Sequence, residues 1–523
     1  MPKTLLSISA ITALGLLLRL ITLGAGIDLD DAITIYVANS HGIAELIANT
    51  TAYEFGPPLY FMLISAWTSL FGKGAVSLAI SSILTGCLLI PLTYMLATRC
   101  LAADSEAGRR QALLAGFFAA VSPLAVFFSH EIRAYSLLAV LCTATMIFFL
   151  DSLENASKKN VALLFLSSTL TIYTHYAGLY LIALLFVSTL FTRPRFKGPV
   201  LKVYLAFGLA LLAFTPWVPQ LLTHLRHGTY WVDRTPLVKA PEVFASNLAA
   251  TLPLPWIAGF LLLALAVPVM LVFFLVKLPT RLRDKGPGRI EHSPSTARIM
   301  LYLTGFAPVF TLGFLTPFIL GYCRYMTPFA VPVWIILAGF IEPRLKGKLV
   351  AGVLLAALAI ASALEIKAIA STDRNGLRAV ARDMKNGRYG DCAFMVVPDF
   401  DSYTLLYYLQ EEQNMDLPDG YLTFPRSGER RPASHRGYAE LWSKEGIVRD
   451  ALDRVEALDQ SRFRRLAVIH DRGLLESSKM PARSVSRTLI DELSHRYGEP
   501  RSTVEYHRPG RSFDLYIFDL NRE

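Results

Sequence analysis

The amino-acid sequence predicts a mainly α-helical, polytopic membrane protein with about 11 transmembrane helices, followed by a C-terminal extracytoplasmic α/β domain. Three observations support this fold class. Of the 523 residues, 53% are hydrophobic and 18% are charged, whereas roughly 25% are charged in an average soluble protein. The apolar residues occur in blocks close to the ~20 residues that span a bilayer. The basic residues are concentrated in alternate loops between these blocks.

Each predicted span is an apolar block bounded by charged or turn-forming residues. Residues 59–71 are apolar but short, and Pro57 with Pro58 would start a helix there. We therefore expect this segment to lie at the membrane interface. The predicted spans are 5–23, 75–97, 112–128, 134–151, 160–175, 177–192, 200–217, 255–276, 299–320, 327–341 and 349–366.

The loop charges predict the orientation of these spans. Loops that would be cytoplasmic, if the N-terminus is cytoplasmic, carry clusters such as Arg109 with Arg110 and Lys158 with Lys159, whereas the opposite loops carry far fewer basic residues. Positive charge is typical of cytoplasmic loops. We therefore expect a multi-pass plasma (inner) membrane protein, in which an odd number of spans places the chain after residue 366 outside the cytoplasm.

The chain after the last span changes character and defines two predicted domains, 1–366 in the membrane and 367–523 as a soluble α/β domain. Charged helical patterns at 376–385, 446–458 and 484–497 alternate with strand-like runs. These runs are 392–398, 466–470 and 513–519, and residues 412–437 are predicted to form a surface loop. No glycine-rich phosphate motif follows any of these strands, so the sequence predicts no nucleotide site.

The overall composition excludes several classes of function. The formal net charge is +10, but membrane topology explains much of it, so we expect no nucleic-acid partner. Five cysteines form no Cys-x-x-Cys pair or Cys/His cluster, which supports neither a zinc site nor a disulfide framework. Arg19 interrupts the first apolar block; it could reach the lipid headgroups or pair with a carboxylate of the following loop.

Candidate functional residues gather in loops that the topology places on one face of the membrane. Asp28, Asp30 and Asp31 follow the first span, and Glu54 lies in the same predicted loop. Ionisable groups at that depth are costly unless they are solvated or functional. Further polar residues in the other loops of this face are Glu131, Arg133, Tyr135, His175, Tyr176, Arg324 and Tyr325. A carboxylate suits a general base, and an arginine can bind phosphate through two parallel hydrogen bonds.

Each of these elements also has a purely structural interpretation. The aspartates could form a solvated acidic loop, and Glu131 could pair with Arg133 in a tight turn between two helices. His175 with Tyr176 could belong to the aromatic belt of the interface. Arg324 could extend towards lipid phosphate. The sequence alone leaves these alternatives open.

In combination, the motifs resemble those of the GT-C glycosyltransferases, specifically the protein mannosyltransferase-like branch with its bacterial lipid- and glycan-modifying members. The resemblance covers residues 1 to about 366. Two positions depart from the family pattern, because the acidic pair is usually Asp-Glu and a His often stands where Gly56 does. The motifs that carry the resemblance are Asp30 with Asp31, Pro57 to Tyr60 (Pro-Pro-Leu-Tyr), Ser129 to Tyr135 (Ser-His-Glu-Ile-Arg-Ala-Tyr), Thr174 to Tyr176 and Arg324 with Tyr325.

The resemblance implies a membrane enzyme that moves a sugar, a hexose or a pentose, from a polyprenyl-phosphate donor to an acceptor hydroxyl outside the cytoplasm, with inversion. The acceptor would be a glycan, a lipid or a protein. Asp30 would act as the general base with Asp31 as its helper. The phosphate charge would be stabilised by Arg133, Arg324 and His175, and the other substrate-binding residues would be Glu54, Glu131, Tyr135, Tyr176 and Tyr325.

No cofactor is predicted. The acids and a phosphate could share a divalent metal, but arginines that already neutralise phosphate make a metal unnecessary. The rival interpretations are a transporter or flippase and a non-catalytic scaffold. Transporters usually place their binding residues near the bilayer midplane on repeat-related helices, whereas here the acids lie at the membrane surface and the sequence has no internal repeat.

Overall fold

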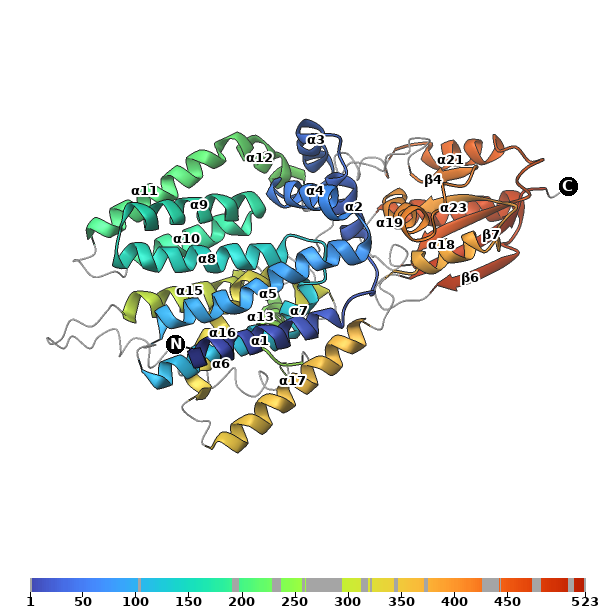
Figure 1. The fold of residues 1–523 in the computed structure, drawn as a ribbon. Coiled ribbons are helices and arrows are strands. Elements are labelled where there is room, and N and C mark those ends of the chain that lie inside the picture. Colours follow the sequence, from blue (N-terminus) through green and yellow to red (C-terminus); the bar gives the residue numbers. More distant parts are fainter. Residues whose placement is uncertain are drawn as a thin grey trace.

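A computed structural model shows a long helical part joined at one end to a smaller part built around a β-sheet (Figure 1). The structure describes residues 2–101, 105–190, 197–227, 237–255, 259, 294–311, 318–319, 322–342, 347–370, 375–425, 442, 444–472, 481–506 and 512–521. The predicted fold class is confirmed: a mainly helical membrane protein with a small C-terminal sheet.

The helical part comprises α1 (Pro2–Leu20), α2 (Leu29–Ala38), α3 (Ile43–Tyr53), α4 (Leu59–Phe71), α5 (Ala75–Cys100), α6 (Glu106–Val121), α7 (Pro123–Phe128), α8 (Tyr135–Glu154), α9 (Lys158–Thr174), α10 (Ala177–Thr189), α11 (Lys197–Phe214), α12 (Val218–His227), α13 (Ala240–Thr251), α15 (Pro294–Thr311), α16 (Thr327–Ile341) and α17 (Lys348–Ala370). The short hairpin β1 (Phe318–Ile319) and β2 (Tyr322–Cys323) precedes α16. Helix α4 has the bounds predicted for an interfacial helix.

Six of the described helical segments are long and apolar enough to cross a membrane. The predicted number of 11 is therefore not confirmed by the described part of the chain. The predicted span 255–276 lies almost entirely outside the described residues. Residues 200–217 do not end at a loop, because α11 continues through a short 3-10 turn into α12, so that the segment Gly198–Arg226 is continuous.

The predicted span 112–128 is wrong as a single helix. It consists of α6 and α7, which meet at Ser122, whose backbone is extended (φ −60°, ψ 121°). Pro123 follows at the first position of α7. Proline has no N–H and is well suited to a first helical turn, so the break leaves carbonyl groups at the end of α6 without their helical partners.

Arg19 supplies partners for these carbonyl groups. Its guanidinium is fully buried and donates from Nη1 to the carbonyl of Ala120 (3.2 Å) and from Nη2 to that of Ala119 (3.3 Å). Its Nε donates to Ser129 Oγ (3.0 Å). Arg19 therefore neither reaches the headgroups nor pairs with a loop carboxylate, since inward-facing carbonyls need a donor that lipid cannot provide.

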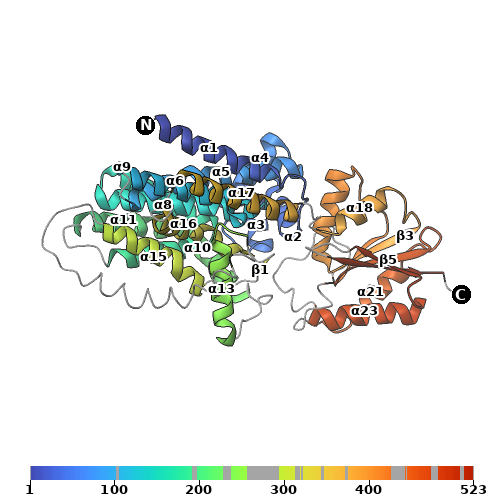
Figure 2. The same ribbon diagram turned by 90° about the horizontal axis from the view of Figure 1, so that it is seen from below.

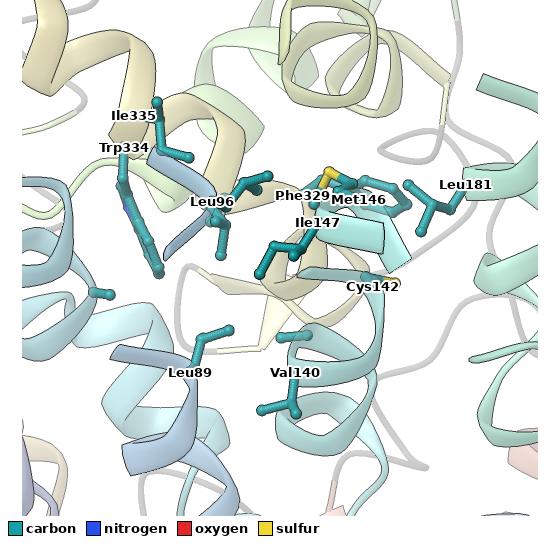
Figure 3. Packing of buried hydrophobic residues seen from close by; sticks show 14 of the residues in the cluster. Leu89, Leu96, Val140, Cys142, Met146, Ile147, Leu181, Phe329, Trp334 and Ile335 are labelled. Carbon is teal, nitrogen blue, oxygen red and sulfur yellow. The ribbon is translucent and has the colours of Figure 1, made fainter. Parts of the chain in front are cut away.

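The core of the helical part lies between α5, α8, α10 and α16. Figure 3 shows Leu96 of α5 beside Ile147 of α8, and Leu89 of α5 nearer to Val140 of α8. Aromatic residues of α16 close the other side of the cluster, where Trp334 donates its indole N–H to the carbonyl of Thr251 (2.7 Å). These helices form the rigid base below the loops that carry the candidate site.

The C-terminal part is a five-stranded mixed sheet in the order β4-β3-β5-β7-β6. Strands β3, β4 and β5 are parallel, and β7 runs antiparallel to both β5 and β6. Helix α18 covers one face and helices α21 and α23 cover the other (Figure 2). The elements are α18 (Leu377–Lys385), β3 (Cys392–Val397), α19 (Ser402–Tyr407), β4 (Tyr421–Thr423), α21 (Ile447–Glu456), β5 (Arg465–Asp471), α23 (Pro481–Tyr497), β6 (Ser502–Tyr506) and β7 (Phe513–Asp519).

Three strands and three helices of this part match the sequence prediction, whereas β4 and β6 were missed. Strand β4 is only three residues long and lies inside the predicted surface loop, most of whose remainder lies outside the described residues. Helix α17 ends at Ala370, four residues beyond the predicted last span. The division into domains at residue 366 itself stays a prediction.

Candidate active site

The acidic stretch after α1 forms the start of helix α2. Asp28 is the N-cap residue, and its side chain and that of Asp31 form a reciprocal capping box. Asp30 and Asp31 occupy the first turn, where negative charge is stabilised by the helix dipole. The same sequence pattern that suggested catalytic acids therefore also specifies where the helix begins.

Neighbouring residues of a helix point about 100° apart, and the two aspartates consequently face different surroundings. Asp31 is 1% exposed. Its Oδ2 accepts the backbone N–H of Asp28 (3.1 Å) and its Oδ1 that of Ile132 (2.8 Å). The side chain of Asp30 is 37% exposed. Asp31 thus joins two loops, whereas Asp30 is accessible at the surface of the site.

Asp30 contacts an arginine that lies 294 residues further along the chain. Arg324 Nη1 donates to Asp30 Oδ2 (2.8 Å) and lies 3.4 Å from the hydroxyl of Tyr135. The arginine stands in the short 3-10 helix Arg324–Met326, between the β1–β2 hairpin and α16. Among the described residues, its Nε has no hydrogen-bond partner. This arginine therefore retains a donor beside an exposed carboxylate.

Arg133 makes a more complete ion pair with Glu54. Its Nη1 and Nη2 donate to Glu54 Oε1 (2.5 Å) and Oε2 (3.0 Å), and Nη1 also donates to Thr34 Oγ1 (2.8 Å). Glu54 is 6% exposed. Burial raises the pKa of Glu54, and Arg133 opposes that rise. Burial alone would lower the pKa of Arg133, but Glu54 and Asp30 hold it well above its usual value.

The turn between α7 and α8 carries Glu131 and Arg133, with Tyr135 at the start of α8, and it is fixed by neighbouring helices. Ser82 of α5 donates its hydroxyl to the carbonyl of Glu131 (2.8 Å), and Ser136 donates to that of Phe128 (2.8 Å). Glu131 is buried. Arg133 donates to Glu54, and the role expected for Glu131 stays a prediction.

Aromatic residues line the side of the site next to α9 and α10. Helix α9 ends at Thr174, so His175 lies in the connecting turn, with its ring 5.1 Å from that of Tyr325 and 6.2 Å from that of Tyr135. Burial, together with Arg133 and Arg324, lowers the pKa of His175 to about 4. The imidazole is therefore neutral at physiological pH and can supply a hydrogen bond but no positive charge.

The structure brings together residues that were predicted from separate loops, and it adds some that sequence reasoning missed. Thr34, one helical turn after Asp30, accepts a hydrogen bond from Arg133. Its spacing of four residues from Asp30 could have indicated that the two side chains share one face of α2. Tyr176 binds His224 Nδ1 through its hydroxyl (2.7 Å) and accepts from Trp217 (3.1 Å). The functional roles of all these residues stay predictions.

Within the ranges that the structure describes, no group of three or more His, Cys, Asp or Glu side chains is arranged to hold a metal ion. Two arginines bond to Asp30: Arg133 donates to its carbonyl and Arg324 to its carboxylate. The arrangement can bind an anionic group beside an accessible carboxylate.

Comparison with known structures places this geometry in a known fold. Across 97% of both chains, the protein matches ArnT from Cupriavidus metallidurans bound to undecaprenyl phosphate, with 15% identity and a TM-score of 0.56. It matches the Archaeoglobus fulgidus oligosaccharyltransferase tethered with an acceptor peptide over 96% of this chain and 72% of that one, at 12% identity and a TM-score of 0.51. The fold is that of the GT-C glycosyltransferases.

The archaeal enzyme AglB from Archaeoglobus fulgidus, in complex with an inhibitory peptide and a dolichol-phosphate, is also similar: 99% of this chain, 74% of that chain, 12% identity and a TM-score of 0.50. Residues 56–219 match the family of dolichyl-phosphate-mannose-protein mannosyltransferases. No curated protein sequence matches the chain. The family match and the fold together confirm the resemblance to a GT-C glycosyltransferase of the protein mannosyltransferase-like branch.

Proposed function

We propose that the protein transfers a hexose or pentose from a polyprenyl-phosphate donor to an acceptor hydroxyl at the extracytoplasmic surface of the membrane, with inversion. The observation that carries this proposal is the contact between Asp30 and Arg324, in which an exposed carboxylate lies 2.8 Å from an arginine. A general base and a phosphate-binding cation are the two groups that such a transfer needs at one place.

In the proposed reaction, Asp30 accepts the proton of the acceptor hydroxyl as its oxygen attacks the anomeric carbon. The new carbon–oxygen bond forms on one face of the sugar while the bond from the anomeric carbon to the phosphate oxygen breaks on the other. The bonding electrons leave with the polyprenyl phosphate, and the configuration inverts. The proton remains on Asp30 until it is released to solvent.

Arg324 would stabilise the charge that develops on the leaving phosphate. Its Nε has no partner among the described residues, and an arginine can bind two phosphate oxygens at once. Phosphate binding would compete with Asp30 for Nη1, which would release the carboxylate to accept a proton. Arg133 would hold the base in place, since it donates to the Asp30 carbonyl (3.1 Å) while Glu54 and Thr34 accept its other hydrogen bonds. His175 would contribute a neutral hydrogen bond.

Three further observations support the donor class and the sidedness. The matched ArnT structure is bound to undecaprenyl phosphate, and the matched AglB structure contains a dolichol-phosphate. The excess of basic residues in the loops on the opposite side predicts that the site lies outside the cytoplasm. A lipid-linked donor would reach the site laterally from the bilayer, and membrane lipid is accordingly the first partner that we expect.

The test is incubation of the purified protein with undecaprenyl-phosphate-linked mannose, glucose or arabinose, each labelled in the sugar, and an extract of membranes as acceptor. The proposal predicts a labelled product with one donor and none with the Asp30→Asn variant. Retention of label in the donor fraction with all three sugars, by protein that binds undecaprenyl phosphate, would count against this reaction. Movement of intact donor across a vesicle membrane would instead support the transporter class.

A further inference from the structure

The loop that leads into α2 has little conformational restraint of its own. Gly24 (φ +95°) and Gly26 (φ +78°) both adopt backbone conformations that other residues rarely take. Glycine is also the residue that loses most conformational freedom on ordering. Asp30 lies only four residues beyond Gly26, so any movement of this loop would shift the start of the helix that carries the proposed base.

A tyrosine of the C-terminal domain binds the middle of this loop. The hydroxyl of Tyr408 accepts the backbone N–H of Ile27 (2.9 Å) and donates to its carbonyl (2.8 Å), across 381 residues of sequence. Tyr408 is fully buried and Ile27 is 1% exposed. A Cβ atom at Gly26 would lie 2.8 Å from the Tyr408 hydroxyl, so the close approach itself requires glycine there.

Two more side chains of the C-terminal domain bind the same loop. Arg378 donates to the carbonyl of Gly24 (3.1 Å) and is itself held by Glu412 (2.8 Å). Asn375 donates to Asp28 Oδ1 (3.2 Å) and is fully buried. The contacts therefore reach the loop at its first glycine, its middle and the N-cap of α2.

Packing continues these contacts along α2. The ring of Tyr403 from α19 lies 4.9 Å from that of Tyr36 and 6.3 Å from that of Tyr53. One apolar cluster includes Ile27 and Ile33 from the membrane part together with Leu405 from the C-terminal domain. Figure 1 shows α2 and α19 side by side at the junction between the two parts. The base-bearing helix is thus packed against the soluble domain.

We infer that the C-terminal domain positions the proposed base, with Tyr408 as the positioning residue. The inference rests on the proposed function. Fixing both polar groups of Ile27 fixes the residue before the N-cap, Asp28 then caps α2, and the orientation of α2 sets the distance from Asp30 to Arg324. The C-terminal domain thereby sets the geometry of a site whose proposed reacting groups, Asp30 and Arg324, lie in the membrane part.

The experiment compares Tyr408→Phe with Tyr506→Phe in the full-length protein in lipid nanodiscs. The control also removes a hydroxyl with two hydrogen bonds, to Tyr389 (2.6 Å) and Asp383 (2.7 Å), but these lie within the C-terminal domain. A displacement near 1 Å at a reacting group costs on the order of 10²-fold in rate. We therefore expect kcat to fall by about 10- to 100-fold in Tyr408→Phe, with the donor KM within about twofold of wild type, and no comparable fall in the control.

Hydrogen exchange provides the second measurement, because Tyr408→Phe leaves the N–H of Ile27 without its acceptor. Exchange in a peptide covering residues 24–31 should accelerate in Tyr408→Phe and not in Tyr506→Phe. Equal losses of kcat in both variants, an unchanged kcat in Tyr408→Phe or unchanged exchange in Tyr408→Phe would each overturn the inference. If Tyr408→Phe does not fold, Arg378→Gln removes the Gly24 contact and should give smaller changes in the same two measurements.

The two proposals fail in distinguishable ways. Wild-type protein that makes no product from undecaprenyl-phosphate-linked mannose, glucose or arabinose would contradict the proposed function. Unchanged exchange of residues 24–31 in Tyr408→Phe would contradict the positioning by Tyr408, whatever the activity. The exchange measurement needs no donor, so it tests the hydrogen bonds to Ile27 independently of the reaction.

Discussion

The two ion pairs at the site differ in the exposure of the carboxylate and in the hydrogen bonds that the arginine donates. Arg133 donates two parallel hydrogen bonds to the buried Glu54 and a third bond to Thr34. Arg324 Nη1 donates to Asp30, whose side chain is over one-third exposed. An arginine held by a buried carboxylate suits a structural role, whereas an accessible carboxylate beside a cation with a remaining donor can take part in chemistry. We therefore expect a structural role for the closed pair, Arg133 with Glu54, and a chemical role for the open pair, Arg324 with Asp30.

The largest expected effect is at the open pair. Asp30→Asn preserves the size of the side chain but removes the proton acceptor, and general-base removal costs about 10²–10⁴ in rate. The rate of sugar transfer should fall by that factor, while binding of undecaprenyl phosphate and the thermal midpoint should stay near those of wild type. Transfer at the wild-type rate would remove Asp30 as the base. A loss of folding instead would make the open pair structural as well.

The closed pair should respond in the opposite way. Arg133→Leu leaves Glu54 buried without its cation, and breaking such a pair costs about 3–5 kcal/mol. We expect a large drop in the thermal midpoint, which the double variant Arg133→Leu with Glu54→Leu should largely reverse, because removing both charges restores compatibility with burial. A stable but inactive Arg133→Leu protein would show that Arg133 acts on the substrate, as we propose for Arg324.

The neighbouring aspartates provide a finer version of the same comparison. Asp31→Asn places an N–H₂ group against one of the two backbone N–H donors that Asp31 now binds. An unsatisfied buried donor costs about 1–3 kcal/mol. The free energy of unfolding should fall by that amount with kcat reduced by only a few-fold. A loss of rate equal to that of Asp30→Asn, in stable protein, would restore Asp31 as the predicted helper of the base.

The smallest effect concerns pH. The pKa of His175 is about 4 in the folded protein against roughly 6.5 in an unfolded chain, so the unfolded state binds more protons between these values. The contribution of neutral His175 to the free energy of unfolding is fully present above about pH 6.5, and it is lost as the pH falls towards 4. In His175→Gln, the slope of the unfolding free energy against pH should decrease on the acid side, by less than about 1.4 kcal/mol per pH unit. Thermal midpoints of both proteins measured at pH 4.5–7.5 test this, and identical slopes would contradict it.

Much of the arrangement could be predicted because membrane topology constrains which loops meet. The sequence predicted that the loops of Asp30, Arg133 and Arg324 share one face, and the hydrogen bonds among these loops are consistent with that placement. Which aspartate faces inward could not be predicted, since it depends on the rotation of α2 about its axis. The bond from Arg133 to Glu54 could not be predicted either, because the sequence suggested only the nearby Glu131 as its partner.

Contacts between the two parts of the protein lay beyond sequence reasoning for a different reason. Tyr408 bonds to the backbone of Ile27, and a backbone partner has no residue type that a pattern could reveal. The break at Ser122 was signalled by Pro123, but proline in an apolar run indicates a kink as readily as a boundary. Local patterns therefore predicted the helices and strands, whereas long-range contacts required the fold.

The burial of Arg19 also has a consequence for the order in which the protein is assembled. When α1 is inserted, the carbonyls of Ala119 and Ala120 and the hydroxyl of Ser129 have yet to be synthesised, since they lie about 100 residues further along the chain. Arg19 stands one residue from the end of α1, where a long side chain can still reach water. The side chain of Arg19 can therefore stay at the surface of the bilayer after α1 is inserted. It turns into the protein only when α6 and α7 have been inserted beside α1.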